Sequence, residues 1–159
     1  MKNYDIYKMK HAGLTNGQVL NVLRYAENKE KELSLRDIAV VSECRNHALF
    51  MERYKQIDDD FLKKSFEEFP SFSILDEIYP WDLSEIYNPP ALFFYQGNID
   101  LLELPKVAVV GSRDSSKLGN QSVQKIIKEL NNELIIVSGL ARGIDTAAHM
   151  AALQNGGRT

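Results

Sequence analysis

The chain has 159 residues, of which 44% are hydrophobic and 26% charged. This length fits one domain or two small ones, and the composition is that of an ordinary globular chain. No apolar run approaches the roughly 18 residues that a membrane helix needs. The single cysteine, Cys44, excludes an internal disulfide and a zinc site of clustered cysteines. Because the amino terminus lacks the pattern of a signal peptide, we expect a cytoplasmic location.

Charge is unevenly spread along the chain. Residues 1–104 contain 12 Lys and Arg against 18 Asp and Glu, a net charge of −6, whereas residues 105–159 contain 7 against 4, a net charge of +3. Indiscriminate coating of DNA needs a basic face, so the formal net charge of −3 argues against it. The net charge does not exclude a local basic site in residues 105–159.

Residues 1–70 are predicted to form a small all-helical domain of four or five short helices. The stretch Thr15 to Gln18 fits a capping box, and the helix that it begins is expected to end at Asn28. Further helices are predicted after Ser34 and after the acidic run 58–60. Because no Lys or Arg cluster falls on one predicted face, a protein partner is favoured over DNA for this domain.

Residues 71–105 are predicted to be a connecting segment that contains one short strand. Proline at four positions interrupts helix formation here, and the aromatic run 91–95 between them is typical of a strand. We expect this strand to join the sheet that follows as an added strand. Phenylalanines at helical spacing before it are interpreted as core rather than as a surface on which bases stack, namely Phe61, Phe66, Phe69 and Phe72.

Residues 106–159 alternate strand, helix, strand and helix. The β-branched runs 106–110 and 134–137 predict two strands buried on both faces. The spacing of apolar residues over 118–130 predicts a helix that Asn131 and Asn132 end, and a second helix begins at Ile144. This order implies parallel pairing with right-handed crossovers, which brings both strand-to-helix turns to one edge of the sheet.

That edge is where open α/β sheets bind ligands, because helix starts offer unpaired N–H groups to anions. Each turn also carries one arginine, whose planar guanidinium can hold a phosphate with two hydrogen bonds. Ser112 and Ser138 are interpreted as hydroxyl donors to phosphate. The phosphate site predicted at this edge consists of the residues of the two turns, namely Gly111, Ser112, Arg113, Ser138, Gly139, Leu140, Ala141, Arg142 and Gly143.

No catalytic residue, cofactor or metal site is predicted. The first turn lacks the Gly-Lys pair of a Walker-type phosphate loop, and Gly139 and Gly143 do not have the spacing of a dinucleotide fingerprint. Asp145 and His149 lie four residues apart on a predicted helix without a third ligand or a nucleophile. They are interpreted as an acid stabilised by the helix dipole and its neighbour, not as an acid-base pair.

The two turns resemble the DNA-processing protein A family, also called DprA or Smf. The resemblance rests on Val107 to Arg113 and on Val137 to His149, with Tyr79 to Leu83 upstream, and it covers roughly residues 71–159. The helical part is most similar to streptococcal members and implies a sterile-alpha-motif-like domain. The resemblance also implies a Rossmann-like parallel sheet that is incomplete here, because members continue beyond the point where a third strand begins near Asn155.

The resemblance implies a non-enzymatic function as well. Family members bind single-stranded DNA, form homodimers and load the RecA recombinase onto incoming strands during natural transformation. By this resemblance, Arg113 and the loop 138–143 are expected to hold the strand, with Arg142 where many members carry lysine. An alternative is a nucleotide- or phosphosugar-binding Rossmann-like enzyme or sensor. A third interpretation, an interaction module with the sheet as a scaffold only, ranks last.

Overall fold

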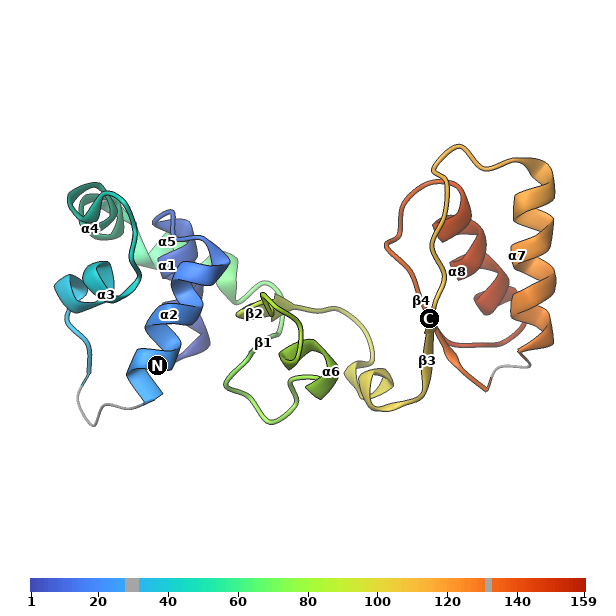
Figure 1. Cartoon of the computed structure of the whole chain (residues 1–159), viewed down its shortest axis with the longest axis horizontal. Coiled ribbons are helices and arrows are strands. Elements are labelled where there is room, and N and C mark those ends of the chain that lie inside the picture. Colours follow the sequence, from blue (N-terminus) through green and yellow to red (C-terminus); the bar gives the residue numbers. More distant parts are fainter. Residues whose placement is uncertain (28–31, 131–132) are drawn as a thin grey trace. The chain divides into compact units, whose positions relative to one another are not determined.

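A computed structural model describes residues 1–27, 32–130 and 133–159, so the helix ends predicted at Asn28 and at Asn131 and Asn132 lie outside the described residues. The chain divides into two compact units, Met1–Gly97 and Asn98–Thr159, which are described separately (Figure 1). Within the described residues, no helix is long and apolar enough to cross a membrane.

The first unit begins with five short helices. They are α1 (Asn3–His11), α2 (Asn16–Glu27), α3 (Leu35–Val41), α4 (His47–Gln56) and α5 (Asp59–Phe66). Side-chain caps begin two of the predicted helices: Ser34 accepts from the backbone N–H of Asp37, and Asp58 accepts from those of Asp60 and Phe61. The acidic run 58–60, predicted to precede its helix, thus supplies the cap and the first two helical residues. The helices close over a core whose innermost side chains are fully buried, namely Ile6, Met9, Val19, Val22 and Ala39.

A small antiparallel sheet completes the first unit. Strand β2 (Leu92–Phe94) pairs with β1 (Ser71–Ser73), and the short helix α6 (Trp81–Ser84) lies between them in the sequence. The predicted strand therefore exists, but the prediction that it joins the parallel sheet is wrong. The physical reason is aromatic packing, since the Phe94 ring lies 5.3 Å from that of Tyr7 in α1 and 5.7 Å from that of Phe66 in α5.

The predicted phenylalanine core is only half correct. Phe72 is buried, and Phe66 packs against Tyr4 and Tyr7. Phe61, by contrast, is 72% exposed, and Phe69 is also exposed. Helix α5 turns the face that carries the buried Leu62 towards the core, and Phe66 shares that face because it follows four residues later. Sequence spacing alone did not identify which face of this short helix is buried.

The second unit has the predicted alternation of strands and helices. After a 3-10 helix, η1 (Ile99–Glu103), come β3 (Lys106–Ala108), α7 (Lys117–Glu129), β4 (Ile135–Val137) and α8 (Ile144–Gln154). Strands β3 and β4 are parallel, with Lys106 opposite Ile135, which confirms the predicted pairing. The core lies between the sheet and the two helices, and its buried members are Ile127, Ile136, Ala148, Ala151 and Ala152.

The prediction that both strands are buried on two faces is wrong for β3. Lys106 and Ala108 are exposed, and Val110, predicted to be in the strand, lies beyond it and is 77% exposed. Strand β4 is better covered, since Ile135 and Ile136 are buried, although Val137 at its end is exposed. At the edge of β4 away from β3, the Ile136 N–H donates to the carbonyl of Arg158 over 3.0 Å. The Thr159 hydroxyl also donates to the Ile136 carbonyl. Residues 158–159 thus lie where a third strand was expected.

A charged contact ties α5 to α1 in the first unit. The Lys8 ammonium lies 2.7 Å from the Asp59 carboxylate, and the Tyr4 hydroxyl donates to the same carboxylate over 2.6 Å. The hydrogen bond from Lys8 and then that from Tyr4 lower the pKa of Asp59 from its ordinary value. Burial, and then the neighbouring Asp59, raise the pKa of Tyr4. The folded state therefore favours an ionised Asp59 and a neutral Tyr4.

This contact predicts an acid-dependent loss of stability in the first unit. Because the pKa of Asp59 is lower in the folded state, its contribution is complete above the unfolded value of about 4 and is lost as pH falls through the folded value. We expect Asp59→Asn to melt at a lower temperature at neutral pH and to show a smaller further loss on acidification. Thermal melts across this pH range test the prediction. Asp60→Asn, an exposed acid of the same helical turn, is the matched control, and equal acid dependence in both variants would contradict it.

Candidate nucleic-acid interface

Two loops lie together at one end of the second unit. The loop 109–116 leads from β3 to α7, and the loop 138–143 leads from β4 to α8, so both lie at the carboxyl ends of the strands (Figure 1). Hydrogen bonds join them directly: the Ser138 hydroxyl donates to the carbonyl of Val109 over 2.7 Å, and the Ile144 N–H donates to that of Ser112 over 3.1 Å. The two predicted turns therefore form one surface.

Two glycines allow this close approach. A Cβ atom at Gly111 would lie 2.6 Å from the Ile144 side chain, so only glycine fits between the first loop and the start of α8. Gly143 has a φ of +80°, and a Cβ there would meet the backbone of Ser112 and lie 2.7 Å from the carbonyl oxygen of Arg113. The loops are thus packed backbone to backbone, and glycine is needed for space as well as for conformation.

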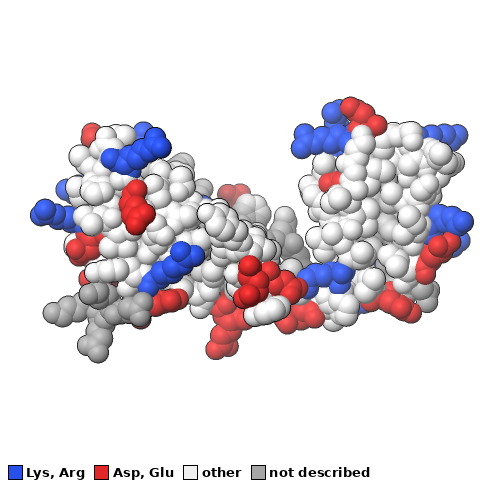
Figure 2. Space-filling view, viewed as in Figure 1, with Lys and Arg blue, Asp and Glu red and all other residues white. Residues whose placement is uncertain are grey.

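The two arginines of the predicted site are both exposed. Within the described residues neither Arg113 nor Arg142 forms a salt bridge, so both guanidinium groups can bind an added anion. In Figure 2, Lys and Arg side chains gather at the end of the second unit where the loops lie, with acidic side chains among them. Asp114, next to Arg113, is one exposed acid of this region. The positive charge is therefore a local feature of the surface around the two loops.

Asp145 accepts hydrogen bonds from two backbone N–H groups of the second loop. The residue is only 7% exposed, and its Oδ2 accepts from the N–H of Gly139 over 3.1 Å and from that of Ala141 over 3.4 Å. Leu140, between these donors, has a φ of +56° and projects with 79% of its surface exposed. The loop thus curls around a carboxylate of its own chain. Sequence reasoning identified Asp145 as a helix-start acid but missed these contacts, although an acid in the first turn of a helix is the available signal.

Of the nine predicted site residues, the structure brings all into these two adjoining loops, and their contact with a nucleic acid stays a prediction. One interpretation changes: the Ser138 hydroxyl hydrogen is directed to Val109, so Ser138 ties the loops together and does not offer its hydrogen to a phosphate. Asp145 and His149 also have separate partners, since the His149 Nδ1 lies 2.5 Å from the Thr159 hydroxyl. The described residues include no group of three or more potential metal ligands.

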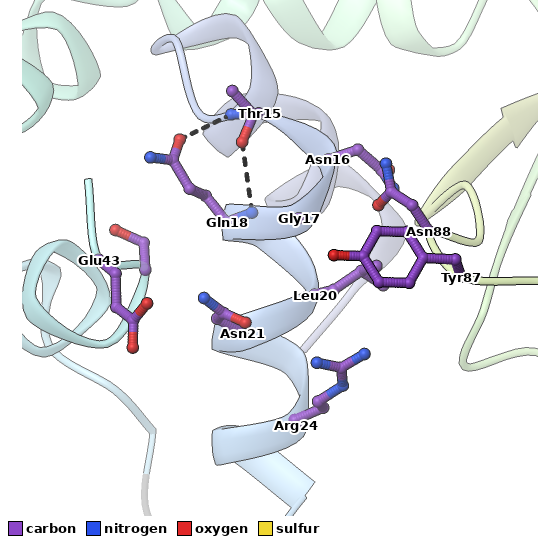
Figure 3. A pocket seen from close by; sticks show the side chains of 11 residues that line it. Thr15, Asn16, Gly17, Gln18, Leu20, Asn21, Arg24, Glu43, Tyr87 and Asn88 are labelled. Atoms are coloured by element: carbon purple, nitrogen blue, oxygen red, sulfur yellow. Dashed lines mark hydrogen bonds between the residues drawn. The ribbon is translucent and has the colours of Figure 1, made fainter. Parts of the chain in front are cut away.

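A separate polar pocket of about 530 Å³ lies in the first unit (Figure 3). Asn16 builds one wall, because its side chain donates to Asn88 and to the carbonyl of Pro89 and accepts from the N–H of Ala91, each over 2.8 Å. The pocket is lined by Thr15, Asn16, Gly17, Gln18, Leu20, Asn21, Arg24, Ser42, Glu43, Tyr87 and Asn88. It contains no residue of the predicted site.

Comparison with known families assigns both units. Residues 71–159, which include both loops, match the model of DNA recombination-mediator protein A. The chain belongs to this family. Residues 1–62 match the sterile alpha motif domain of DNA processing protein A, which confirms the helical domain expected from the resemblance. The fold class predicted from the sequence, a helical domain before a partial Rossmann-like sheet, is also confirmed.

Similarity to individual relatives supports the same family assignment. The chain is 69% identical over 99% of its length to DNA processing protein DprA of Streptococcus pneumoniae, covering 56% of that protein. It is 42% identical to DNA processing protein DprA of Bacillus subtilis over 51% of its own length, covering 28% of that protein. The X-ray structure of S. pneumoniae DprA superimposes with a TM-score of 0.95 at 68% identity, over 99% of this chain and 56% of that one. The chain thus spans about half the length of the S. pneumoniae relative, and less of the other.

The packing of the two loops predicts that Gly143 tolerates no side chain. We expect Gly143→Ala to destabilise the second unit by about 1–3 kcal/mol or more, because the substitution adds both a strained backbone and a clash with the first loop. Denaturant unfolding monitored by NMR of second-unit residues measures the effect.

Gly156→Ala is the matched control for this prediction. Gly156 also has a positive φ, of +73°, but nothing lies within 4 Å of the place where its Cβ would be. The difference between the two variants therefore isolates the contact between the loops. Equal destabilisation by both would mean that backbone strain, and not the close approach, makes glycine necessary at position 143.

Proposed function

We propose that the second unit binds single-stranded DNA without regard to sequence, through the phosphates of the strand. The observation that carries this proposal is the pair of exposed arginines, Arg113 and Arg142, on two loops that glycine packing joins into one surface. Guanidinium groups bind phosphates with paired hydrogen bonds and read no base, which suits a strand of any sequence. Gly111, Ser112 and the loop 138–143 complete the proposed contact surface.

The family supports a role in recombination. Its model is described as a DNA recombination-mediator protein, and its curated relatives are named DNA processing proteins. We propose that the protein to which this chain corresponds protects incoming single strands during natural transformation and loads RecA recombinase onto them. It acts without a catalytic step of its own, as a cytoplasmic homodimer. Contacts with RecA and between subunits are assigned to no residue of this chain.

The first unit is proposed to bind a protein. Its sequence carries the acidic excess of the chain, and Figure 2 shows Asp and Glu interspersed with Lys and Arg over its visible face. Exposed DNA phosphates are repelled by an acidic surface, whereas a protein with basic side chains is attracted. We therefore assign strand binding to the second unit alone.

The arginine pair gives the direct test of the proposed function. We expect Arg113→Ala to weaken binding of a fluorescein-labelled oligothymidine by about 1–3 kcal/mol, because a charged contact with two hydrogen bonds is lost. The dependence of log affinity on log salt should become shallower by about 0.7, the value for one phosphate of a single strand. Fluorescence anisotropy over a salt series measures both quantities.

Lys128→Ala is the control for this test. Lys128 is an exposed cation in the last turn of α7, whereas the first loop precedes the start of that helix. The variant therefore loses the same charge without losing the proposed contact. If Arg113→Ala and Lys128→Ala bind equally well, the loops are not the DNA site.

The same titration separates strand binding from the nucleotide-binding alternative. A site that contacts several phosphates gives a steep salt dependence, and thymidine monophosphate should compete weakly with the oligonucleotide. A pocket for one small anion would bind the monophosphate as tightly as the strand, with a shallow salt dependence. That result would favour a nucleotide- or phosphosugar-binding protein.

A further inference from the structure

The second loop poses a problem for simple phosphate binding. Loops at the start of a helix hold anions through backbone N–H groups, and the loop 138–143 has the position and the glycines for this role. Yet two of its N–H groups, those of Gly139 and Ala141, already donate to the carboxylate of Asp145. The chain has placed an anion of its own where an external phosphate would otherwise be held.

Asp145 is fitted closely to this place. A Cβ atom at Gly139 would lie 3.0 Å from its Oδ2, so glycine there allows the carboxylate to approach the loop. The part of the loop that leads into α8 is also fixed, because the N–H and the hydroxyl of Thr146 both donate to the carbonyl of Ala141, over 3.1 and 2.7 Å. Asp145 is buried, whereas Leu140 and Arg142 are exposed. The carboxylate thus forms the inner support of a loop whose outer side faces solvent.

We propose that Asp145 is a positioning residue for DNA binding. Its carboxylate holds the loop 138–143 in place, so that Arg142 is presented beside Arg113. The same carboxylate excludes phosphate from the N–H groups of Gly139 and Ala141. This inference rests on the proposed function. Phosphate recognition then belongs to the guanidinium groups and not to these two backbone donors. A buried, hydrogen-bonded carboxylate lowers the positive electrostatic potential at the loop, but it holds the loop in one conformation.

The proposal distinguishes the negative charge of Asp145 from its hydrogen bonds. Asp145→Asn removes the charge but keeps an oxygen that accepts from the same N–H groups. Asp145→Ala removes both. If the charge alone mattered, both variants would bind DNA more tightly, because a negative group near phosphates repels them. If positioning matters, only the alanine variant loses the ordered loop.

Asp114→Ala is the matched control. Asp114 is an exposed acid on the first loop, and among the described residues its carboxylate forms no hydrogen bond or salt bridge with the second loop. The control variant therefore changes the charge near the arginines by the same amount while leaving the loop 138–143 intact. Its oligothymidine affinity defines the purely electrostatic effect of losing one acid.

Two measurements on the 159-residue chain test the inference. Amide hydrogen exchange by NMR reports on the Gly139 and Ala141 N–H groups, and we expect it to accelerate at least about tenfold in Asp145→Ala, since hydrogen bonds to a charged group are lost. Asp145→Asn should keep most of the protection, and Asp114→Ala all of it. Oligothymidine affinity should fall about threefold or more in Asp145→Ala, relative to Asp114→Ala, and should not fall in Asp145→Asn.

Three results would overturn the inference. Unchanged amide exchange in Asp145→Ala would show that the carboxylate does not hold the loop. Affinity in Asp145→Ala equal to that of Asp114→Ala would leave only an electrostatic effect. New protection of the Gly139 and Ala141 amides when oligothymidine binds to Asp145→Asn would show that phosphate competes for these donors. If the unmodified chain binds no oligonucleotide, the proposed function fails, while the exchange data still decide whether Asp145 positions the loop.

Discussion

The close approach of two backbone loops is the constraint on which the rest of the second unit depends. Ile144 at the start of α8 packs against Gly111, and the Ile144 N–H donates to the carbonyl of Ser112. Because this contact leaves no room for side chains at Gly111 and Gly143, the first turn of α8 is locked to the end of β3. The position of each arginine follows from that lock, since Arg113 and Arg142 are the residues next to the contact.

The charge of the chain changes sign close to the boundary between the two units. The acidic excess belongs to residues that are mostly in the first unit, whose core is built by helices and by the aromatic packing of β2 on α1 and α5. The basic excess belongs to residues 105–159, which lie within the second unit and carry the two exposed arginines. Two backbone N–H groups of the second loop already donate to Asp145. This division of charge is the basis for proposing two different partners, a protein for the acidic helical unit and a strand of DNA for the locally basic sheet unit.

The way the second loop is stabilised also bears on how such a site can be sequence-independent. Backbone donors are fixed in place and favour one anion position, whereas guanidinium groups on exposed side chains adapt to phosphates at varied positions. Asp145 accepts hydrogen bonds from two backbone N–H groups of the loop, so these two groups are not free to hold a phosphate at a fixed position. In the proposed function, the arginines supply the adaptable contacts, which a flexible strand of any sequence can satisfy.

The sequence by itself determined the order of elements, the parallel pairing of β3 with β4 and the meeting of two glycine turns at one edge, because hydrophobic periodicity and chain connectivity are local properties. The sequence motifs at 107–113 and 137–149 also identified the family. Only the tertiary structure decided that Leu92–Phe94 pairs with Ser71–Ser73, that Phe61 is exposed, and that Asp145 and Ser138 point into the loops. Each of these features depends on which surfaces meet in space. Residues far apart in the chain compete for the same packing or hydrogen-bond partner, and spacing along the sequence does not record the outcome.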